Sequence, residues 1–549
     1  MRDVHWESLV DPRTRAVWAK VGWTAFCFAF AGALLSMHGS PHAEVRLTLP
    51  QWAIFPGPFW VSLGAMFGSL ALVFVAASRY LDRVFVTIGF VITLTLPAFW
   101  FTVYGSDGPS VLGLAERFTQ TGVLNPRDNV YFQWPLFFNE ILIGRSILGL
   151  SLPGVLALLT VILSIATPLS MIPIFERIVP DSGPTAVILY FSGFYLVLNW
   201  QPVPQTLGFL LFLQCLLLVP RRGASPIAFA TLFAAIGLLH PFVGTWLILF
   251  LVFSGSLEFA LQRKTSSLGA LLAVVAIQAA ILAYQSTLFF GQVARVLSGY
   301  LKAVSDVQLT QGGVTRYGLL AQRLPNSVSD VALRAIGWIN LAIVLVMIGI
   351  AFVRGIRRIA KSPFQSGLVL SGLFQVIGGF FAPILGVRGF QVAALPLPSK
   401  VLEAGRTSRK KTTPLVVAVV ILLFVGNVVG MFSATTNYQN DQEHAAAQFY
   451  DANVYGLPKR VVVLADHSMA GYLGSRLPAR ATLIDSLLLS PNLIDSSNPN
   501  VVCLSSQLRT EFDTLGFFSN TKFNTYFDRV ASSYLEIYDS GDVQWLVSE

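Results

Sequence analysis

The residues best suited to chemistry lie in a polar segment, residues 104–140, that separates two long apolar stretches. Asp107 follows the first of these stretches by only a few residues, so we expect its carboxylate to lie at a membrane–water boundary, ionised but partly shielded from water. Glu116 is a second carboxylate in the same segment. Such a group can act as a general base that accepts the proton of an attacking hydroxyl. The alternative is an ordinary solvated loop bordered by interfacial aromatic residues.

Three basic residues could meet an anionic ligand on the same side of the membrane. Arg388 is the only charged residue between positions 364 and 400, and a guanidinium can bind a phosphate through two parallel hydrogen bonds. The alternative is an arginine at a helix end that extends to the interface without a ligand. Arg295 and Lys302 lie in the region 290–334, which is either a lid that meets an anionic substrate or an ordinary long loop.

Two further polar residues interrupt apolar stretches. His240 directly precedes Pro241, so its imidazole either hydrogen-bonds a carbonyl group that the proline leaves without a partner or faces the same outer cavity as Asp107. Gln205 follows a Pro-x-Pro turn and opens the next apolar stretch, where its simplest role is structural.

Membrane-spanning helices would have to position all of these residues. The chain has 549 residues, of which 54% are hydrophobic and 12% are charged. Soluble domains carry about twice that charged fraction. Apolar stretches of roughly 18 to 25 residues recur along the chain, and each could cross a hydrocarbon core of about 30 Å. We therefore predict a mainly α fold, a polytopic transmembrane bundle of about 13 helices.

The charge pattern predicts the orientation of this bundle. Five short clusters of Lys and Arg, from Arg79 and Arg83 to Lys410 and Lys411, would all face the cytoplasm if the N-terminus is cytoplasmic. The polar segment 104–140 and everything after residue 433 would then lie outside. The net charge of +9 thus indicates topology and no nucleic acid, because the basic residues form no continuous face. We predict a multi-pass protein of the cell membrane.

The composition becomes polar after residue 433, which predicts two domains. Residues 1–433 would form the transmembrane domain, and residues 434–549 a small extracytoplasmic α/β domain. The domain lacks the glycine-rich motifs of nucleotide-binding proteins. Its expected strands and terminal hairpin are residues 460–465, 481–485, 500–505 and 534–547.

Taken in order, these features resemble the GT-C superfamily, polytopic membrane glycosyltransferases that use polyprenyl-phosphate-linked sugars. The resemblance rests on Gly-Ser-Asp107 followed by LGLAERF, the stretch YFQWPLFF, the Pro-x-Pro-Gln turn at Gln205, His240-Pro241, the isolated Arg388 and a terminal YDSGDVQWL. It implies that Asp107 is the catalytic base and that Arg388 binds the lipid phosphate. Glu116 is the second catalytic candidate. The further candidates for substrate binding are His240, Lys302, Arg295, Trp134 and Gln205.

The sequence departs from the family pattern in its first outer loop. It lacks the Asp-x-Asp motif or paired acidic residues that some members carry there, so no metal ligands are predicted. No cofactor is required by the sequence, and a divalent metal such as Mg or Mn stays an open alternative. Two crossings also precede the one that enters this loop, where many members have one.

The resulting hypothesis is an enzyme that transfers a sugar from a polyprenyl-phosphate carrier to a glycan, lipid or protein acceptor at the outer face. A single carboxylate base suits direct displacement, so we expect inversion at the sugar carbon. Two alternatives from other classes are a transporter or flippase of an envelope precursor and a non-catalytic scaffold. Against transport, the apolar stretches show no internal repeat and almost no ionisable residue near their middles.

Overall fold

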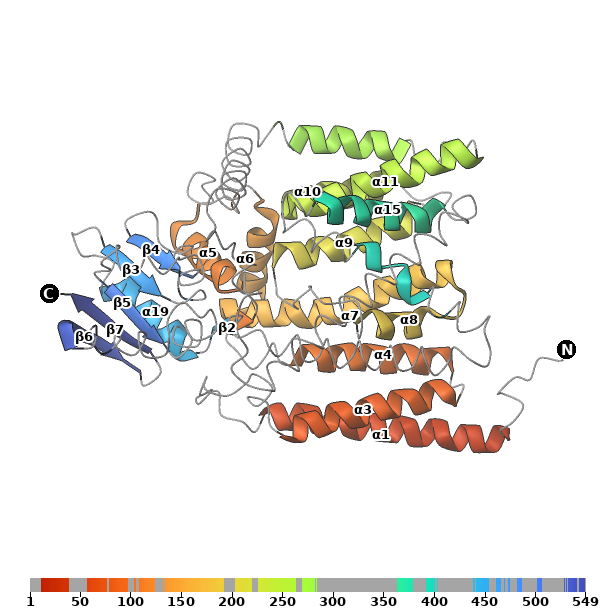
Figure 1. Ribbon diagram of the computed structural model, residues 1–549, viewed down its shortest axis with the longest axis horizontal. Helices are drawn as coiled ribbons and strands as arrows, with labels where there is room; N and C mark the ends of the chain where they lie inside the picture. The colour runs from red at the N-terminus through yellow and green to blue at the C-terminus, as the bar shows by residue number, and fades with distance from the viewer. Residues whose placement is uncertain are drawn as a thin grey trace, which may run out of the picture.

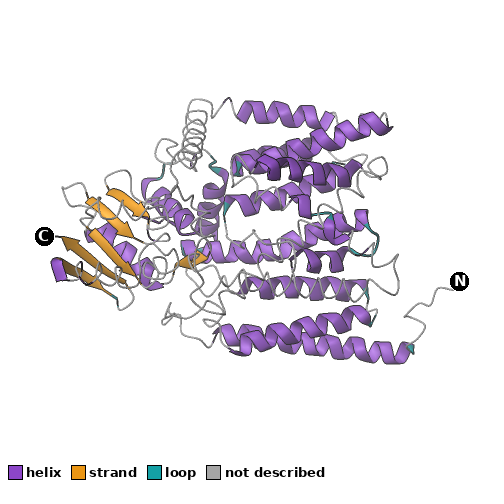
Figure 2. Ribbon diagram, viewed as in Figure 1, coloured by secondary structure: helices purple, strands orange, loops and turns teal. Residues whose placement is uncertain are grey.

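The structure is a computed structural model in which the described residues are mostly helical, with a small sheet near the C-terminus (Figures 1 and 2). It describes residues 11–38, 57–76, 79–96, 103–104, 108–123, 132, 134–191, 203–219, 226–262, 269–281, 283, 363–378, 392–399, 402, 438–439, 441–453, 461–465, 469, 472–473, 481–485, 501–505, 528, 530, 532–540 and 543–548.

Long helices lie side by side and form the larger part of the molecule (Figure 1). Their first members pack in chain order, α1 against α3 and α3 against α4, whereas α7 contacts both α4 and α9. The described helices of this bundle include α1 (Pro12–His38), α3 (Gly57–Val75), α4 (Tyr80–Thr95), α7 (Leu152–Ile178), α8 (Gly183–Leu189), α9 (Pro204–Leu218), α10 (Pro226–Leu239), α11 (Pro241–Gln262), the helix Gly269–Ile281 and α15 (Pro363–Gly378).

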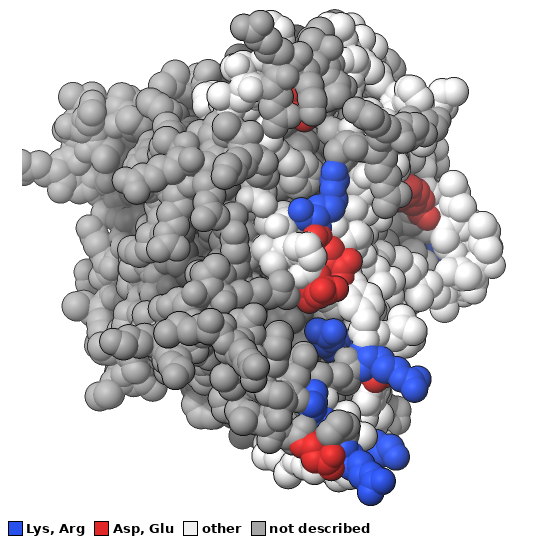
Figure 3. Space-filling model, turned by 90° about the vertical axis from the view of Figure 1, so that its right-hand side faces the viewer, with Lys and Arg blue, Asp and Glu red and all other residues white. Residues whose placement is uncertain are grey.

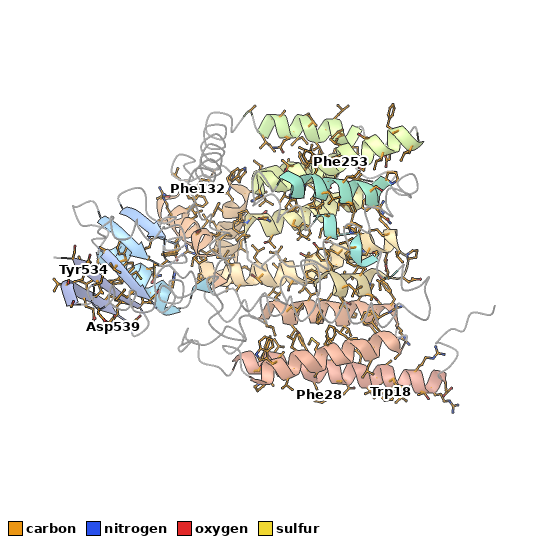
Figure 4. All side chains as sticks on the ribbon, in the orientation of Figure 1. Trp18, Phe28, Phe132, Phe253, Tyr534 and Asp539 are labelled. Atoms are coloured by element: carbon orange, nitrogen blue, oxygen red, sulfur yellow. The ribbon has the colours of Figure 1, made fainter. Side chains whose placement is uncertain are left out.

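Four of the described helices are long and apolar enough to cross a membrane: Arg13–Ser36, Gly57–Phe74, Leu152–Ile178 and Val243–Leu261. On the outer side of α1, Trp18 and Phe28 point away from the bundle (Figure 4) and are 50% and 74% exposed. Apolar side chains in such positions are suited to contact with lipid. The described helices thus support a membrane-associated bundle, while the expected 13 crossings and their orientation stay predictions.

Small residues allow two parts of this bundle to approach closely. A Cβ atom at Gly372 of α15 would lie 2.6 Å from Cα of Ala393, far inside normal contact distance. The same helix carries Gly367, where a Cβ atom would lie 3.0 Å from Cα of Ser254 on α11. Glycine is therefore required at both positions because backbone from a neighbouring segment occupies the space of a side chain.

The C-terminal region folds around a five-stranded sheet with the order β4-β3-β5-β7-β6. β3 pairs in parallel with β4 and β5, and the terminal hairpin β6–β7 joins β5 in antiparallel fashion. The predicted strands and hairpin are confirmed to within a residue or two at each end. The elements are α19 (Asp441–Asn453), β3 (Val461–Ala465), β4 (Ala481–Asp485), β5 (Val501–Ser505), β6 (Tyr534–Asp539) and β7 (Val543–Ser548).

The polar segment 104–140 is largely helical and connects the bundle to the sheet. It contains β1 (Val103–Tyr104 at its start), α5 (Gly108–Thr121) and the beginning of α6 (Leu136–Leu148). Figure 1 shows α5 and α6 between the bundle and the sheet. The alternative of an ordinary solvated loop is therefore wrong for the described part of this segment.

Candidate functional site

Helix α5 is the element that carries Glu116, and its sequence has clear start and stop signals. Pro109 stands in the first turn, where a missing N–H is tolerated. Gly122 follows the last residue with φ of 66°, and its N–H donates to the carbonyl of Phe118 over 2.8 Å. The buried face of α5 consists of Val111, Leu112, Leu114, Ala115 and Phe118.

This buried face forms a hydrophobic core together with the C-terminal domain. Phe137 and Phe138 of α6 join it from one side, and Ala446 of α19, Val463 of β3 and Trp545 of β7 join it from the other. Residues of the polar segment and of the C-terminal domain thus share one core, which is distinct from the core of the helical bundle. We call this shared region the junction.

A short antiparallel pairing adds a backbone connection at the junction. β1 pairs with β2 (Tyr438–Gln439), so that Val103 lies opposite Gln439 and Tyr104 opposite Tyr438. The segment that enters the polar region is therefore tied to the segment that begins the C-terminal domain. Asp107 itself lies outside the described residues, but the chain on both sides of it is described: β1 ends at Tyr104 and α5 begins at Gly108.

Glu116 is held at the junction by two side chains from the C-terminal domain. The hydroxyl of Tyr472 donates a hydrogen bond to Oε2 of Glu116. The Oε1 atom lies 3.5 Å from Nε2 of His444, and the side chains of His444 and Glu116 are only 15% and 14% exposed. Tyr472 is fully buried. Hydrogen bonds to a carboxylate in such partly dry surroundings are stronger than they would be in water.

The rings of His444 and Tyr472 also contact each other, with centroids 5.5 Å apart at an angle of 79°. Nε2 of His444 lies 3.0 Å from Nε2 of Gln448, one turn further along α19. Tyr472, His444 and Gln448 therefore form one connected group that can orient the carboxylate of Glu116.

Helix α19 is itself fixed to the sheet, and this fixes the position of His444. Nε1 of Trp545 donates to the carbonyl of Ala446 over 2.8 Å, and both residues are buried. The ring of Trp545 also lies against that of Tyr450, with centroids 4.8 Å apart. Because Trp545 belongs to β7, which pairs with both β5 and β6, the anchor reaches an interior strand of the sheet.

Arg117 and Trp134 lie in the same part of the molecule. Arg117 is only 7% exposed, and its guanidinium lies 6.0 Å from the centroid of the Phe132 ring. Phe132 can be found beside α5 and α6 in Figure 4. Trp134, a candidate for substrate binding, is 6% exposed and so belongs to the interior of the junction.

The structure also brings His240 and Gln205 to this end of the bundle. His240 is buried at the break between α10 and α11, where its backbone N–H donates to the carbonyl of Ile236 over 2.8 Å. Gln205 is the second residue of α9 and is half-buried. Their neighbours Leu239 and Val203 belong to the junction core. Both residues thus lie where a helix of the bundle begins or ends near the candidate site, and the roles expected for them stay predictions.

The remaining candidates, Asp107, Arg295, Lys302 and Arg388, lie outside the described residues. Sequence reasoning missed Tyr472 and His444, because neither belongs to a recognisable motif. Tyr472 is 356 positions away from Glu116, so no local pattern could have paired them.

Within the described ranges, no group of three or more His, Cys, Asp and Glu side chains could hold a metal ion. Mg or Mn therefore stays an open alternative that the described residues do not support. No protein-family model matches the chain, and a search of the curated proteins finds no match either.

Proposed function

We propose that this protein is a membrane glycosyltransferase that moves a sugar from a polyprenyl-phosphate carrier to a glycan, lipid or protein acceptor at the outer face of the membrane. The observation that supports it best is the junction. There, α5 carries the largely buried carboxylate of Glu116 and lies between the helical bundle and the C-terminal α/β domain. The C-terminal domain then has a direct role in the site, which transport would not require.

The reaction joins the acceptor oxygen to the anomeric carbon of the sugar and breaks the bond from that carbon to the carrier phosphate. Asp107 takes the acceptor hydroxyl's proton, and a general base of this kind contributes roughly a hundred- to ten-thousand-fold in rate. The polyprenyl phosphate leaves with the bonding electron pair. Arg388 stabilises the charge that develops on it, because a fixed cation counts for more near a membrane interface than in water.

We assign different roles to the two carboxylates. Glu116 already accepts a hydrogen bond from Tyr472 and lies beside His444. Both of its carboxylate oxygens therefore already face a side chain of the C-terminal domain. Glu116 therefore acts as a positioning residue that fixes α5 and, through its first residue Gly108, the chain next to Asp107.

The test is sugar transfer in reconstituted vesicles, with purified polyprenyl-phosphate sugars as donors and cell-envelope fractions as acceptors. The parent is compared with Asp107→Asn and Arg388→Ala at matched levels of folded protein, with and without a chelator of divalent metals. We expect Asp107→Asn to abolish transfer and Arg388→Ala chiefly to raise the donor concentration required. If all donors are inert with the parent protein, the proposal fails and a scaffold or transporter takes its place.

A further inference from the structure

A cavity of about 330 Å³ opens at the end of the bundle opposite the C-terminal domain. It is lined by Pro173, Glu176 and Arg177 of α7 and by Leu217 of α9. Leu152 and Val203, near the starts of these two helices, belong to the junction core, so the cavity lies at their other ends. Figure 3 shows this end of the molecule, where basic and acidic side chains lie close to one another.

The cation of this cavity is fixed in orientation. Nη1 of Arg177 donates to the carbonyl of Leu216 on α9 over 3.2 Å. Its guanidinium also lies 4.8 Å from the centroid of the Phe364 ring on α15. This hydrogen bond and this aromatic contact both restrain the plane of the guanidinium. A fixed guanidinium loses less entropy on binding a phosphate than a mobile lysine would.

The anion beside it is fixed in the same way. The carboxylate of Glu176 accepts a hydrogen bond from the hydroxyl of Tyr80 on α4. Arg83 and Asp181 also interact electrostatically with Tyr80. Among the described residues that line the cavity, Arg177 carries a guanidinium and Glu176 a carboxylate. A lining with both signs favours a ligand that carries both signs over a ligand with net negative charge.

The cavity lies at the depth where a lipid head group would lie. The whole of α7 is long and apolar enough to cross a membrane, and Glu176 and Arg177 are among its last three residues. These charged groups then lie at the membrane–water boundary. Pro173 precedes them by about one helical turn, so apolar surface continues toward the bilayer interior.

We propose that this cavity binds the head group of a phospholipid that carries a phosphate and a primary ammonium group. The phosphate lies against Arg177, the ammonium donates to Glu176, and the first methylene groups of the lipid contact Pro173 and Leu217. The volume is within the range of about 300 to 1,000 Å³ that is typical of ligand sites. This inference does not depend on the proposed transferase activity.

The test measures which lipids stay bound to the purified full-length protein. The protein is reconstituted in nanodiscs of phosphatidylcholine that contain equal small amounts of phosphatidylethanolamine and phosphatidylglycerol, and retained lipids are counted by native mass spectrometry. We expect phosphatidylethanolamine to be enriched, because its ammonium has three N–H donors and choline has none. Glu176→Gln should lower this enrichment by about tenfold, since it removes the charge but still accepts the Tyr80 hydrogen bond.

Two further variants test whether the lipid binds in this cavity and whether the effect is specific to the carboxylate of Glu176. Leu217→Trp should fill the cavity and remove lipid retention there, whatever the head group. Glu258 lies near the C-terminal end of α11 and does not line the cavity, so Glu258→Gln should leave the enrichment unchanged.

Three results would overturn the inference. Equal retention of all three lipids by the parent protein would exclude recognition of the ammonium group. Unchanged enrichment in Leu217→Trp would show that the lipid binds elsewhere. Binding of soluble phosphoethanolamine, which lacks acyl chains, as tightly as phosphatidylethanolamine would assign the cavity to a water-soluble ligand instead.

Discussion

The hydrogen bond between Tyr472 and Glu116 gives the sharpest test of the junction, because one atom can be removed without changing the packing. Tyr472→Phe deletes only the hydroxyl that donates to the carboxylate. Hydrogen bonds to charged groups contribute about 1.5 to 3 kcal/mol. Tyr472 is fully buried and Glu116 only 14% exposed, so solvent screens this interaction little. We therefore expect Tyr472→Phe to destabilise the junction by about 1.5 to 3 kcal/mol.

The assay is hydrogen exchange of the backbone amides of α5 and α19, which open when the junction separates. A loss of about 1.5 to 3 kcal/mol corresponds to a roughly 10- to 100-fold faster exchange by local opening. Glu116→Ala, which removes the acceptor, is combined with Tyr472→Phe in a double-mutant cycle, which isolates the coupling between the two side chains. Tyr538→Phe is the matched control, because it removes a hydroxyl from a half-buried tyrosine on β6 and keeps the ring that packs against Phe449 of α19.

The reasoning is refuted if Tyr472→Phe accelerates exchange no more than Tyr538→Phe does. It is refuted equally if the two substitutions at Glu116 and Tyr472 are fully additive, since partners in one hydrogen bond must couple.

Two further predictions concern packing and the anchor of α19. Gly372→Ala should destabilise the protein by about 1 to 3 kcal/mol, because a methyl group would collide with the backbone of Ala393, and thermal unfolding in detergent measures the loss. Gly68→Ala, at an exposed helical position with nothing within 4 Å, should be neutral or slightly stabilising, and an equal loss in both variants contradicts the argument. Trp545→Phe should cost about 1 to 3 kcal/mol by removing the buried hydrogen bond from the indole to the carbonyl of Ala446; unchanged stability would show that this hydrogen bond does not anchor α19.

The sequence predicted those parts of the fold that depend on local pattern. The short β-branched runs at β3, β4 and β5 and the turn between β6 and β7 are local signals, and the strands lie where they indicate. Long apolar stretches likewise predicted α1, α3, α7 and α11, whose length and composition suit a membrane.

The candidate site was less accessible to sequence reasoning, because it depends on contacts between distant segments. The high polarity of residues 104–140 suggested a loop, although the apolar residues of α5 recur on one helical face. That face is buried because α6, the start of α7 and the C-terminal domain together cover it. The partners of Glu116, Tyr472 and His444, likewise arise from tertiary packing and from no motif.

The most direct test of the proposed function compares the rates of sugar transfer by Asp107→Asn and Glu116→Gln in the same vesicles. The account predicts that Asp107→Asn lowers the rate by roughly a hundred- to ten-thousand-fold, whereas Glu116→Gln, which alters only positioning, stays within about tenfold of the parent. Full activity of Asp107→Asn, or a larger loss in Glu116→Gln, would contradict the assignment of Asp107 as the base.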